Sequence, residues 1–285
     1  MRWEFGRRST NVEDRRGTRV SAPVVGGGIG AVILSLIVAF LGGDPSVIWE
    51  QRQQPSDRPS SQSPQTQSSA NSDRMADFVS VVLADTEDTW RSLFQQQGKT
   101  YREPTLVLYS DAVESACGFT RSAVGPFYCP SDQKLYIDLS FYEDLKNRYQ
   151  APGDFAQAYV IAHEVGHHVQ NLMGISQQVR TLQRQTDQAE ANQLSVRQEL
   201  QADCFAGVWA YHSDRSRQIL ETGDIEEALN AASSIGDDRL QSQARGYVIP
   251  ESFTHGSSAQ RVRWFKRGIQ TGNPEQCNTF TAANP

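Results

Sequence analysis

Three of the five histidines of the chain lie in one short segment, IAHEVGHHVQ (161–170). His163 and His167 are four positions apart, so in a helix both imidazoles lie on one face, one turn apart. Two ring nitrogens at that spacing can bind one zinc ion at about 2 Å. Glu164 would lie beside such an ion, placed to take a proton from a water molecule that the zinc holds. His168 points about 140° round the helix from His163 and is not expected to be a ligand.

A catalytic zinc ion usually has three protein ligands, so two histidines leave the predicted site one ligand short. The segment ELQADCFAGVWA (199–210) provides Glu199 and Asp203, four apart on an otherwise apolar helix. We expect Glu199 to bind the zinc and Asp203 to accept the N–H of a ligating histidine, which fixes its tautomer. Glu190 and His212 are the alternative ligands. Neither is as well placed, because Glu190 lies in a polar stretch and His212 follows the apolar part of the helix. The prediction is a site for one Zn²⁺ ion.

A helix over residues 154–173 is expected to position the first motif. Asp154 can cap its N-terminus, and Gly174 follows it where a left-handed residue is favoured. The surrounding residues are apolar, so a buried helix with hydrogen-bonded histidines is the alternative. However, burying Glu164 is costly unless its carboxylate meets a cation, and a zinc ion would supply that cation.

The remainder of the C-terminal part is predicted to be mostly helical with a small sheet, an α+β fold. Apolar residues at helical spacing predict a helix over 74–96, and short apolar runs predict strands over 105–110 and 134–142. The polar segment 176–193 is interpreted as a mobile helical segment. Further helices are expected over 194–212, 224–236 and 257–270.

The first part of the chain predicts a membrane anchor. Residues 1–23 contain six arginines and three acidic residues, a local charge of +3, whereas the whole chain has a net charge of −6. That overall charge argues against nucleic acid as a partner. Residues 24–43 are uncharged and long enough to span a hydrocarbon core of about 30 Å. A cleaved signal peptide and a buried helix are the alternatives.

We therefore expect a single uncleaved transmembrane helix over 24–43 that binds the lipid bilayer of the cell membrane. The positive-inside rule places residues 1–23 in the cytoplasm and the catalytic domain outside the cytoplasm. Residues 44–73 are rich in Ser, Gln and Pro, a composition typical of a flexible linker. The folded domain is then expected over 74–285.

The four cysteines agree with an exported domain. An even number of cysteines in an oxidising compartment suggests two disulfides, which allow three pairings. Cys117 and Cys129 flank a short loop that contains Gly and Pro, so we favour Cys117–Cys129 together with Cys204–Cys277. Four buried free thiols are the alternative.

These motifs resemble those of known zinc peptidases. HEVGH (163–167) with ELQAD (199–203) is similar to the gluzincin pattern HExxH…ExxxD of thermolysin-like and membrane-associated zinc endopeptidases. Nearly the whole chain outside the linker resembles the predicted bacterial neutral zinc metallopeptidases, the YpfJ-like family. The segments that carry this resemblance, besides the two zinc motifs, are FGRRSTNVEDRRG, CGFTRSAVGPFYCPSDQKLYIDLSFY and FTHGSSAQRVRWF. The resemblance implies a zincin-like α+β domain and peptide-bond hydrolysis, without naming a substrate.

The resemblance also implies roles for two residues near the C-terminus. His255 followed by Arg261 is similar to the THP…R segment of related membrane zinc proteases, with glycine in place of the proline. By this analogy His255 would donate a hydrogen bond to the oxyanion formed during hydrolysis; a plain helix cap is the alternative. Arg261 would orient Asp203 or Glu199, or else be a surface charge on the last helix.

The expected function is that of a membrane-anchored zinc metallopeptidase, an endopeptidase that uses Glu164 to activate a zinc-held water on a peptide or protein substrate. Strand 134–142 is a candidate sheet edge for an extended substrate. The alternatives are a zinc-stabilised, membrane-anchored scaffold protein and a zinc hydrolase of cell-wall peptides. A structural zinc ion needs four protein ligands and no base, which argues against the scaffold.

Overall fold

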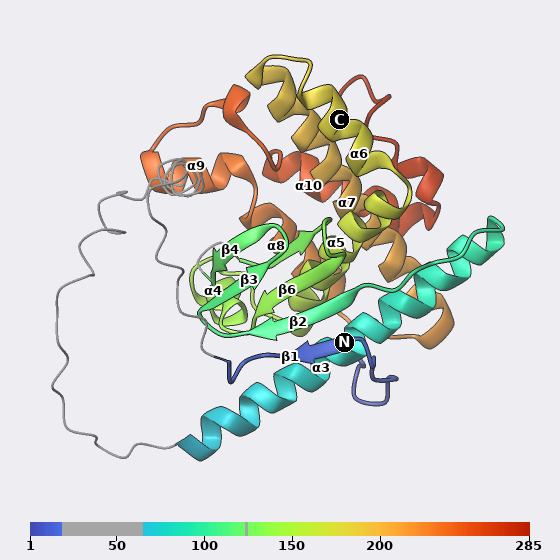
Figure 1. The fold of residues 1–285 in the computed structure, drawn as a ribbon, viewed down its shortest axis with the longest axis vertical. Helices are drawn as coiled ribbons and strands as arrows, with labels where there is room; N and C mark the ends of the chain where they lie inside the picture. The colour runs from blue at the N-terminus through green and yellow to red at the C-terminus, as the bar shows by residue number, and fades with distance from the viewer. Residues whose placement is uncertain (19–64, 123–124) are drawn as a thin grey trace, which may run out of the picture.

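The computed structural model describes residues 1–18, 65–122 and 125–285, and in these residues it is mostly helical with a small sheet, as an α+β fold requires (Figure 1). The helices are α3 (Gln65–Gln96), α4 (Phe141–Asn147), α5 (Asp154–Leu172), α6 (Ile175–Gln183), α7 (Gln188–Arg217), α8 (Asp224–Ser234), α9 (Asp237–Arg245) and α10 (Ser258–Thr271), with 3-10 turns η2 (Pro250–Ser252) and η3 (Pro274–Cys277). The strands are β1 (Val12–Asp14), β2 (Thr105–Tyr109), β3 (Ala112–Ser115), β4 (Gly118–Arg121), β5 (Phe127–Cys129) and β6 (Lys134–Asp138).

The main sheet has the strand order β1-β2-β6-β5, and β3 and β4 form a separate hairpin. Strands β1, β2 and β6 are parallel, and β5 runs antiparallel to β6. Because alternate residues of a strand face opposite sides, β2 divides its side chains between two clusters. Leu106 and Leu108 join the main core with the helices, whereas Val107 and Tyr109 join a smaller cluster that includes Val113 of the hairpin.

Strand β6 corrects the prediction for residues 134–142. It pairs with β2 on one side and β5 on the other, so it has no free edge for a substrate. The strand ends at Asp138, and Phe141 and Tyr142 belong to α4 instead. Among the described strands, β5 is the edge of the sheet on this side.

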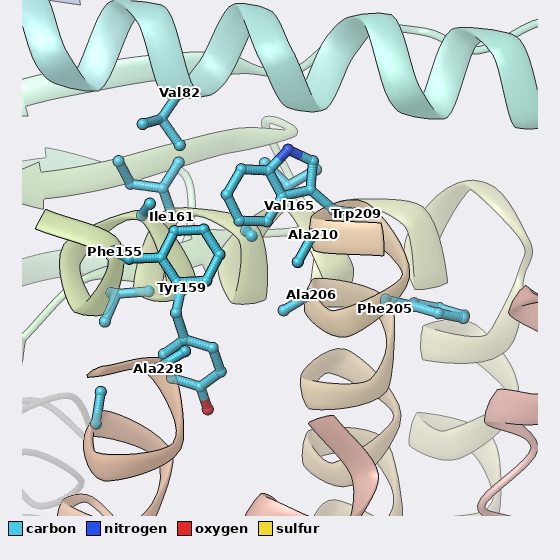
Figure 2. Packing of buried hydrophobic residues seen from close by; sticks show 14 of the residues in the cluster. Val82, Phe155, Tyr159, Ile161, Val165, Phe205, Ala206, Trp209, Ala210 and Ala228 are labelled. Atoms are coloured by element: carbon cyan, nitrogen blue, oxygen red, sulfur yellow. The ribbon is translucent and has the colours of Figure 1, made fainter. Parts of the chain in front are cut away.

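Helix α5 lies at the centre of the helical part. Its buried side chains contact α3, α7 and α8, as Figure 2 shows for Val82 of α3 and Trp209 of α7. The rings of Phe155 and Trp209 are stacked, with centroids 5.7 Å apart. Each such large side chain stabilises the fold by roughly 1.5–3 kcal/mol when fully buried. The helix therefore cannot shift without disturbing three neighbours.

Glycines bring the helices of the two zinc motifs and α10 into close contact. A Cβ atom on Gly166 of α5 would lie 3.0 Å from the carbonyl oxygen of Ala202 in α7. A Cβ atom on Gly207 of α7 would lie 2.2 Å from the carbonyl oxygen of Phe265 in α10, so these two helices touch through their backbones. Larger residues at these positions would separate the helices that carry the polar residues described below.

The predicted N-terminal transmembrane helix requires a correction. The described residues contain no helix with the length and apolar character needed to cross a bilayer. Residues 24–43, for which the helix was predicted, lie outside the described residues, as does most of the predicted linker. Instead of a separate segment, residues 1–18 are part of the folded domain, since β1 pairs with β2 along Val12–Asp14.

The charges of the N-terminal segment explain why it was misinterpreted. Arg7 pairs with Glu87 of α3, and Arg8 pairs with Asp77 of the same helix. Trp3 is buried against Phe78, edge to face. Arg7 and Arg8, two of the arginines that resembled the cytoplasmic flank of a membrane helix, thus have carboxylate partners inside the domain.

Candidate metal centre

The structure brings His163, His167 and Glu199 together. Their ligand atoms lie within 4.8 Å of one another. The Nε2 atom of His163 is 3.1 Å from one carboxylate oxygen of Glu199, and the Nε2 atom of His167 is 3.3 Å from the other. The carboxylate therefore faces both imidazoles from the adjacent helix α7. Two imidazole nitrogens and one carboxylate are a donor set that suits a catalytic zinc ion, so the residues present fit this metal.

The outer nitrogen of His163 is held by a buried charged group. Its Nδ1 atom lies 2.8 Å from Asp203 Oδ1. Arg261 of α10 donates to both oxygens of Asp203, from Nε and Nη2, at 2.9 Å each. Tyr159, one turn before His163, donates its hydroxyl to the same carboxylate at 2.5 Å. In Figure 2 the Tyr159 hydroxyl points out of the hydrophobic cluster, away from α3. Arg261 is only 2% exposed, so it is not a surface charge.

The charged group shifts the pKa values of its members. Burial alone raises the pKa of Asp203, but Arg261 and His163 more than offset this, and the net pKa is lowered. Burial lowers the pKa of His163, and the Asp203 carboxylate outweighs this effect, so that its net pKa is raised. Asp203 is therefore ionised at neutral pH. An ionised Asp203 accepts the Nδ1 proton of His163 and leaves Nε2 as the atom that faces Glu199.

The outer nitrogen of His167 has a neutral partner. Its Nδ1 atom lies 2.9 Å from Oε1 of Gln170, a fully buried residue of the same helix. Both histidines therefore direct Nε2 toward Glu199 and Nδ1 toward a protein oxygen. This is the arrangement in which neutral histidines bind metal ions in proteins.

Glu164 is 8% exposed and lies next to His163 in α5. Its negative charge contributes to raising the pKa of His167 against the effect of burial, so its carboxylate is near the donor set. Among the described residues, no hydrogen-bond donor occupies this carboxylate. It is therefore available to a water molecule or a substrate.

His255 lies in the loop before α10. The loop packs onto α7, because a Cβ atom on Gly256 would lie 3.1 Å from Leu200 and 3.3 Å from Val196. His255 Nδ1 is 3.2 Å from Asp237 Oδ1, while half of the side chain is exposed. Burial lowers the pKa of His255, but the hydrogen bond to Asp237 and the charge of Glu199 outweigh it, so the pKa is raised. His255 is not the cap of α10, because Ser257 caps that helix.

The other polar candidates lie elsewhere. His168 is buried between Tyr128, whose hydroxyl is 3.0 Å from Nδ1, and the carbonyl oxygen of Arg102. Burial lowers the pKa of His168 to about 4, so it is neutral. His212 Nε2 is bonded to the carbonyl oxygen of Gly272, and Glu190 is exposed at the start of α7. Neither alternative ligand joins the donor set.

Both expected disulfides are present. Cys117 is bonded to Cys129, which links the β3–β4 hairpin to β5, and Cys204 is bonded to Cys277, which links α7 to η3. The described residues contain no free cysteine. The second disulfide lies one residue after Asp203, so it ties the C-terminal segment to the helix turn that supports His163.

Sequence reasoning missed four polar residues near the donor set. Tyr159 is four residues before His163 and Gln170 is three residues after His167, so both share the helix face of the ligands, and their polarity in an apolar helix was an available signal. Gln201 is buried between the two acidic residues of ELQAD. Asp237 is distant from His255 in sequence, and no sequence pattern links the two.

The helical fold, the HExxH motif of α5 and the facing glutamate of α7 are together the features of a class of zinc peptidases. Comparison with known proteins specifies the family. Residues 1–280 match the family described as "Putative neutral zinc metallopeptidase", and the chain belongs to that family. No solved structure matches the chain.

Two relatives extend this comparison. The chain is 55% identical to the protein YpfJ of Escherichia coli, with 98% of this chain and 99% of the relative covered. It is 40% identical to the protein Rv2575 of Mycobacterium tuberculosis, with 86% of this chain and 85% of the relative covered. Both relatives are named as uncharacterized proteins, so their names state no activity.

Proposed function

We propose that this protein is a zinc endopeptidase in which His163, His167 and Glu199 hold one Zn²⁺ ion and Glu164 acts as general base. The observation that carries the proposal is the donor set of three residues with the carboxylate of Glu164 beside it, to which no described residue donates a hydrogen bond. A structural zinc site has four protein ligands, whereas a catalytic site has three and leaves a position for water or substrate. A zinc ion bound here would supply Lewis-acid polarisation of a substrate carbonyl and acidify a water molecule.

Glu164 takes the proton of the attacking water in the proposed reaction. It then passes this proton to the nitrogen of the cleaved peptide bond, which leaves as an amine. General acid–base catalysis of this kind contributes about 10²–10⁴-fold to the rate. The carboxylate of Glu164 suits this role because none of the described residues donates a hydrogen bond that would have to be displaced first.

His255 donates a hydrogen bond to the oxygen that becomes negative when the water attacks the carbonyl carbon. Its contact with Asp237 occupies Nδ1, and its half-exposed ring leaves Nε2 for the substrate. An extended peptide would lie along β5, one of the two edge strands of the described sheet, rather than along β6. Strand β5 is joined to α5 through Tyr128, whose hydroxyl contacts His168 and accepts from Asn171.

The two disulfides support a location of the domain outside the cytoplasm. Structural disulfides persist in oxidising compartments and are rare in the reducing cytosol. Because residues 1–18 are part of the same domain, the proposal places them in that compartment as well.

The test is a comparison of Glu164→Gln and His163→Ala with the parent protein. Zinc content is measured by elemental analysis, and hydrolysis by mass spectrometry of a peptide library with and without chelator. Glu164→Gln should keep stoichiometric zinc and lose hydrolysis by about 10²–10⁴-fold, whereas His163→Ala should lose the zinc.

Undiminished cleavage by Glu164→Gln would overturn the role of this residue. Stoichiometric zinc without cleavage of any peptide by the parent would favour the scaffold protein. Cleavage confined to cell-wall peptides in a parallel digest would assign the substrate to that class.

A further inference from the structure

His167 is hydrogen-bonded through Nδ1 to the neutral amide of Gln170, which is itself hydrogen-bonded to Gln201. We infer that Gln170 is a positioning residue that holds His167 in the tautomer needed for metal binding, and that Gln201 and the disulfide-bonded Cys277 hold Gln170 in turn. The inference rests on the proposed metal site. Through Cys277, the C-terminal segment would then help to orient the proposed ligand His167.

The orientation of the Gln170 amide follows from its neighbours. Its Nε2 atom lies 2.7 Å from the carbonyl oxygen of Gln198. A carbonyl oxygen can only accept, so the NH₂ group of Gln170 must face Gln198. The amide oxygen of Gln170 then faces His167 Nδ1 at 2.9 Å, and this oxygen also can only accept. His167 must therefore carry its proton on Nδ1.

A second amide repeats this reasoning one step further from the metal. Gln201 Nε2 donates to the carbonyl oxygen of Cys277 at 3.0 Å. Its own amide oxygen then accepts the second hydrogen of the Gln170 NH₂ group, at 3.1 Å. The directions of the hydrogen bonds in the series Cys277, Gln201, Gln170, His167 are thus set by two backbone carbonyls, that of Cys277 at Gln201 and that of Gln198 at Gln170.

The consequence for the metal site is a single tautomer. In the neutral form of His167, the form that binds a metal ion, a proton on Nδ1 leaves the lone pair on Nε2, the atom that faces Glu199. Gln170 is fully buried and Gln201 is 5% exposed, so water does not replace these bonds. Partners of this kind orient ligating histidines, and their loss typically costs 10–100-fold in metal affinity or activity.

The position of Cys277 is set by two further constraints. Cys277 is buried and bonded to Cys204 of α7. Gln201 lies one turn before Cys204 on that helix, so the disulfide holds the carbonyl of Cys277 opposite the Gln201 amide. The C-terminal segment after α10 is thereby connected to the ligand His167 without touching the metal.

The test measures metal binding rather than activity. Gln170→Met keeps the length of the side chain and removes both its donor and its acceptor. We expect this variant to bind Zn²⁺ about 10–100-fold more weakly than the parent protein in competition with a chromogenic chelator. The visible absorption spectrum of the Co²⁺-loaded variant should differ from that of the parent, because the orientation of one ligand has changed.

Two further variants separate positioning from stability. Gln201→Met breaks the series without touching His167 and should weaken zinc binding less than Gln170→Met, with a combined effect in the double variant smaller than the sum. Gln241→Met removes a buried glutamine of α9 that bonds Ser252, and should leave zinc affinity unchanged. If Gln170→Met proves unstable, Gln201→Met alone carries the test.

The outcomes are distinguishable. If the parent binds no zinc, the proposed function fails. If the parent binds one zinc ion and both Gln170→Met and Gln201→Met bind it within twofold of the parent, only the inference fails. A structural role alone would lower the thermal midpoint of the metal-free variants but leave the increase that zinc produces unchanged; the inference requires that increase to shrink.

Discussion

The two proposed histidine ligands are supported in opposite ways. His163 is hydrogen-bonded to the buried carboxylate of Asp203, which also accepts hydrogen bonds from Arg261 of α10 and from the hydroxyl of Tyr159. His167 is instead hydrogen-bonded to the neutral amide of Gln170. The same task, holding a proton on Nδ1, is thus performed once by an ionic partner and once by an uncharged one.

The difference has energetic consequences. A neutral hydrogen bond contributes only about 0.5–1.5 kcal/mol net, so losing one mainly relaxes the orientation of His167. Removing one member of a buried ion pair leaves an uncompensated charge and costs about 3–5 kcal/mol. The charged support therefore couples the metal site to the stability of the whole helical core, whereas the neutral support couples it to the C-terminal segment.

The largest expected effect comes from breaking the charged support. Asp203→Asn leaves Arg261 buried without a counter-ion, so we expect a loss of about 3–5 kcal/mol in the free energy of unfolding. Zinc affinity should fall by about 100-fold, since His163 loses the charged carboxylate that accepts its Nδ1 proton. Urea denaturation of the metal-free protein and chelator competition measure the two quantities.

A double variant is the control for this prediction. Asp203→Asn combined with Arg261→Met removes the unpaired charge and should recover part of the unfolding free energy without restoring zinc affinity. Full recovery of both quantities would contradict the orientation of His163 by Asp203.

An intermediate effect is expected from the disulfide next to the neutral support. Replacing Cys204 and Cys277 by serine releases η3, so zinc affinity should fall by up to about tenfold, with a loss of about 2–5 kcal/mol in stability. Replacing Cys117 and Cys129 is the matched control. It should lower stability near the β3–β4 hairpin and leave zinc affinity unchanged, and equal losses of affinity in both pairs would remove the distinction.

The smallest effect concerns His255, a histidine held by a carboxylate that is not a ligand. Asp237 raises the pKa of His255 above the value that burial alone would set. Because the proposed donor must be protonated, activity is present below this pKa and lost as the pH rises through it. Asp237→Asn should lower the pKa, so kcat/KM should begin to fall at a lower pH. An unchanged alkaline limb would show that His255 does not carry the required proton.

Much of the helical part could be predicted because its signals are local. The period of apolar residues placed α5, α8 and α10 to within a few residues, and the glycine after α5 has the expected left-handed φ of 78°. The strands β1, β3, β4 and β5 were missed, since short strands with charged or glycine-containing sequences have no alternating pattern to reveal them. Strand β1 forms because it pairs with β2, which lies far along the chain, so its formation depends on the tertiary structure.

The N-terminal arginines show the same limit. A run of basic residues before an apolar stretch is typical of a membrane anchor, and sequence alone contains no sign that Arg7 and Arg8 pair with α3. Their partners Glu87 and Asp77 lie far along the chain. Charge patterns identify a class of environment, but only the folded chain shows which carboxylates neutralise them.

By itself the sequence was enough to predict a zinc site at His163, Glu164 and His167, because the three residues are related by the fixed geometry of one helix. It also indicated Glu199 and Asp203, since their spacing is again local. Tertiary structure alone decided how these parts are oriented. Gly166 and Gly207 let three helices approach until Arg261 reaches Asp203, and the fold brings the carbonyl of Cys277 to the amide series behind His167. Hydrogen-bond direction depends on which groups meet across helices, and that information is distributed over residues far apart in the chain.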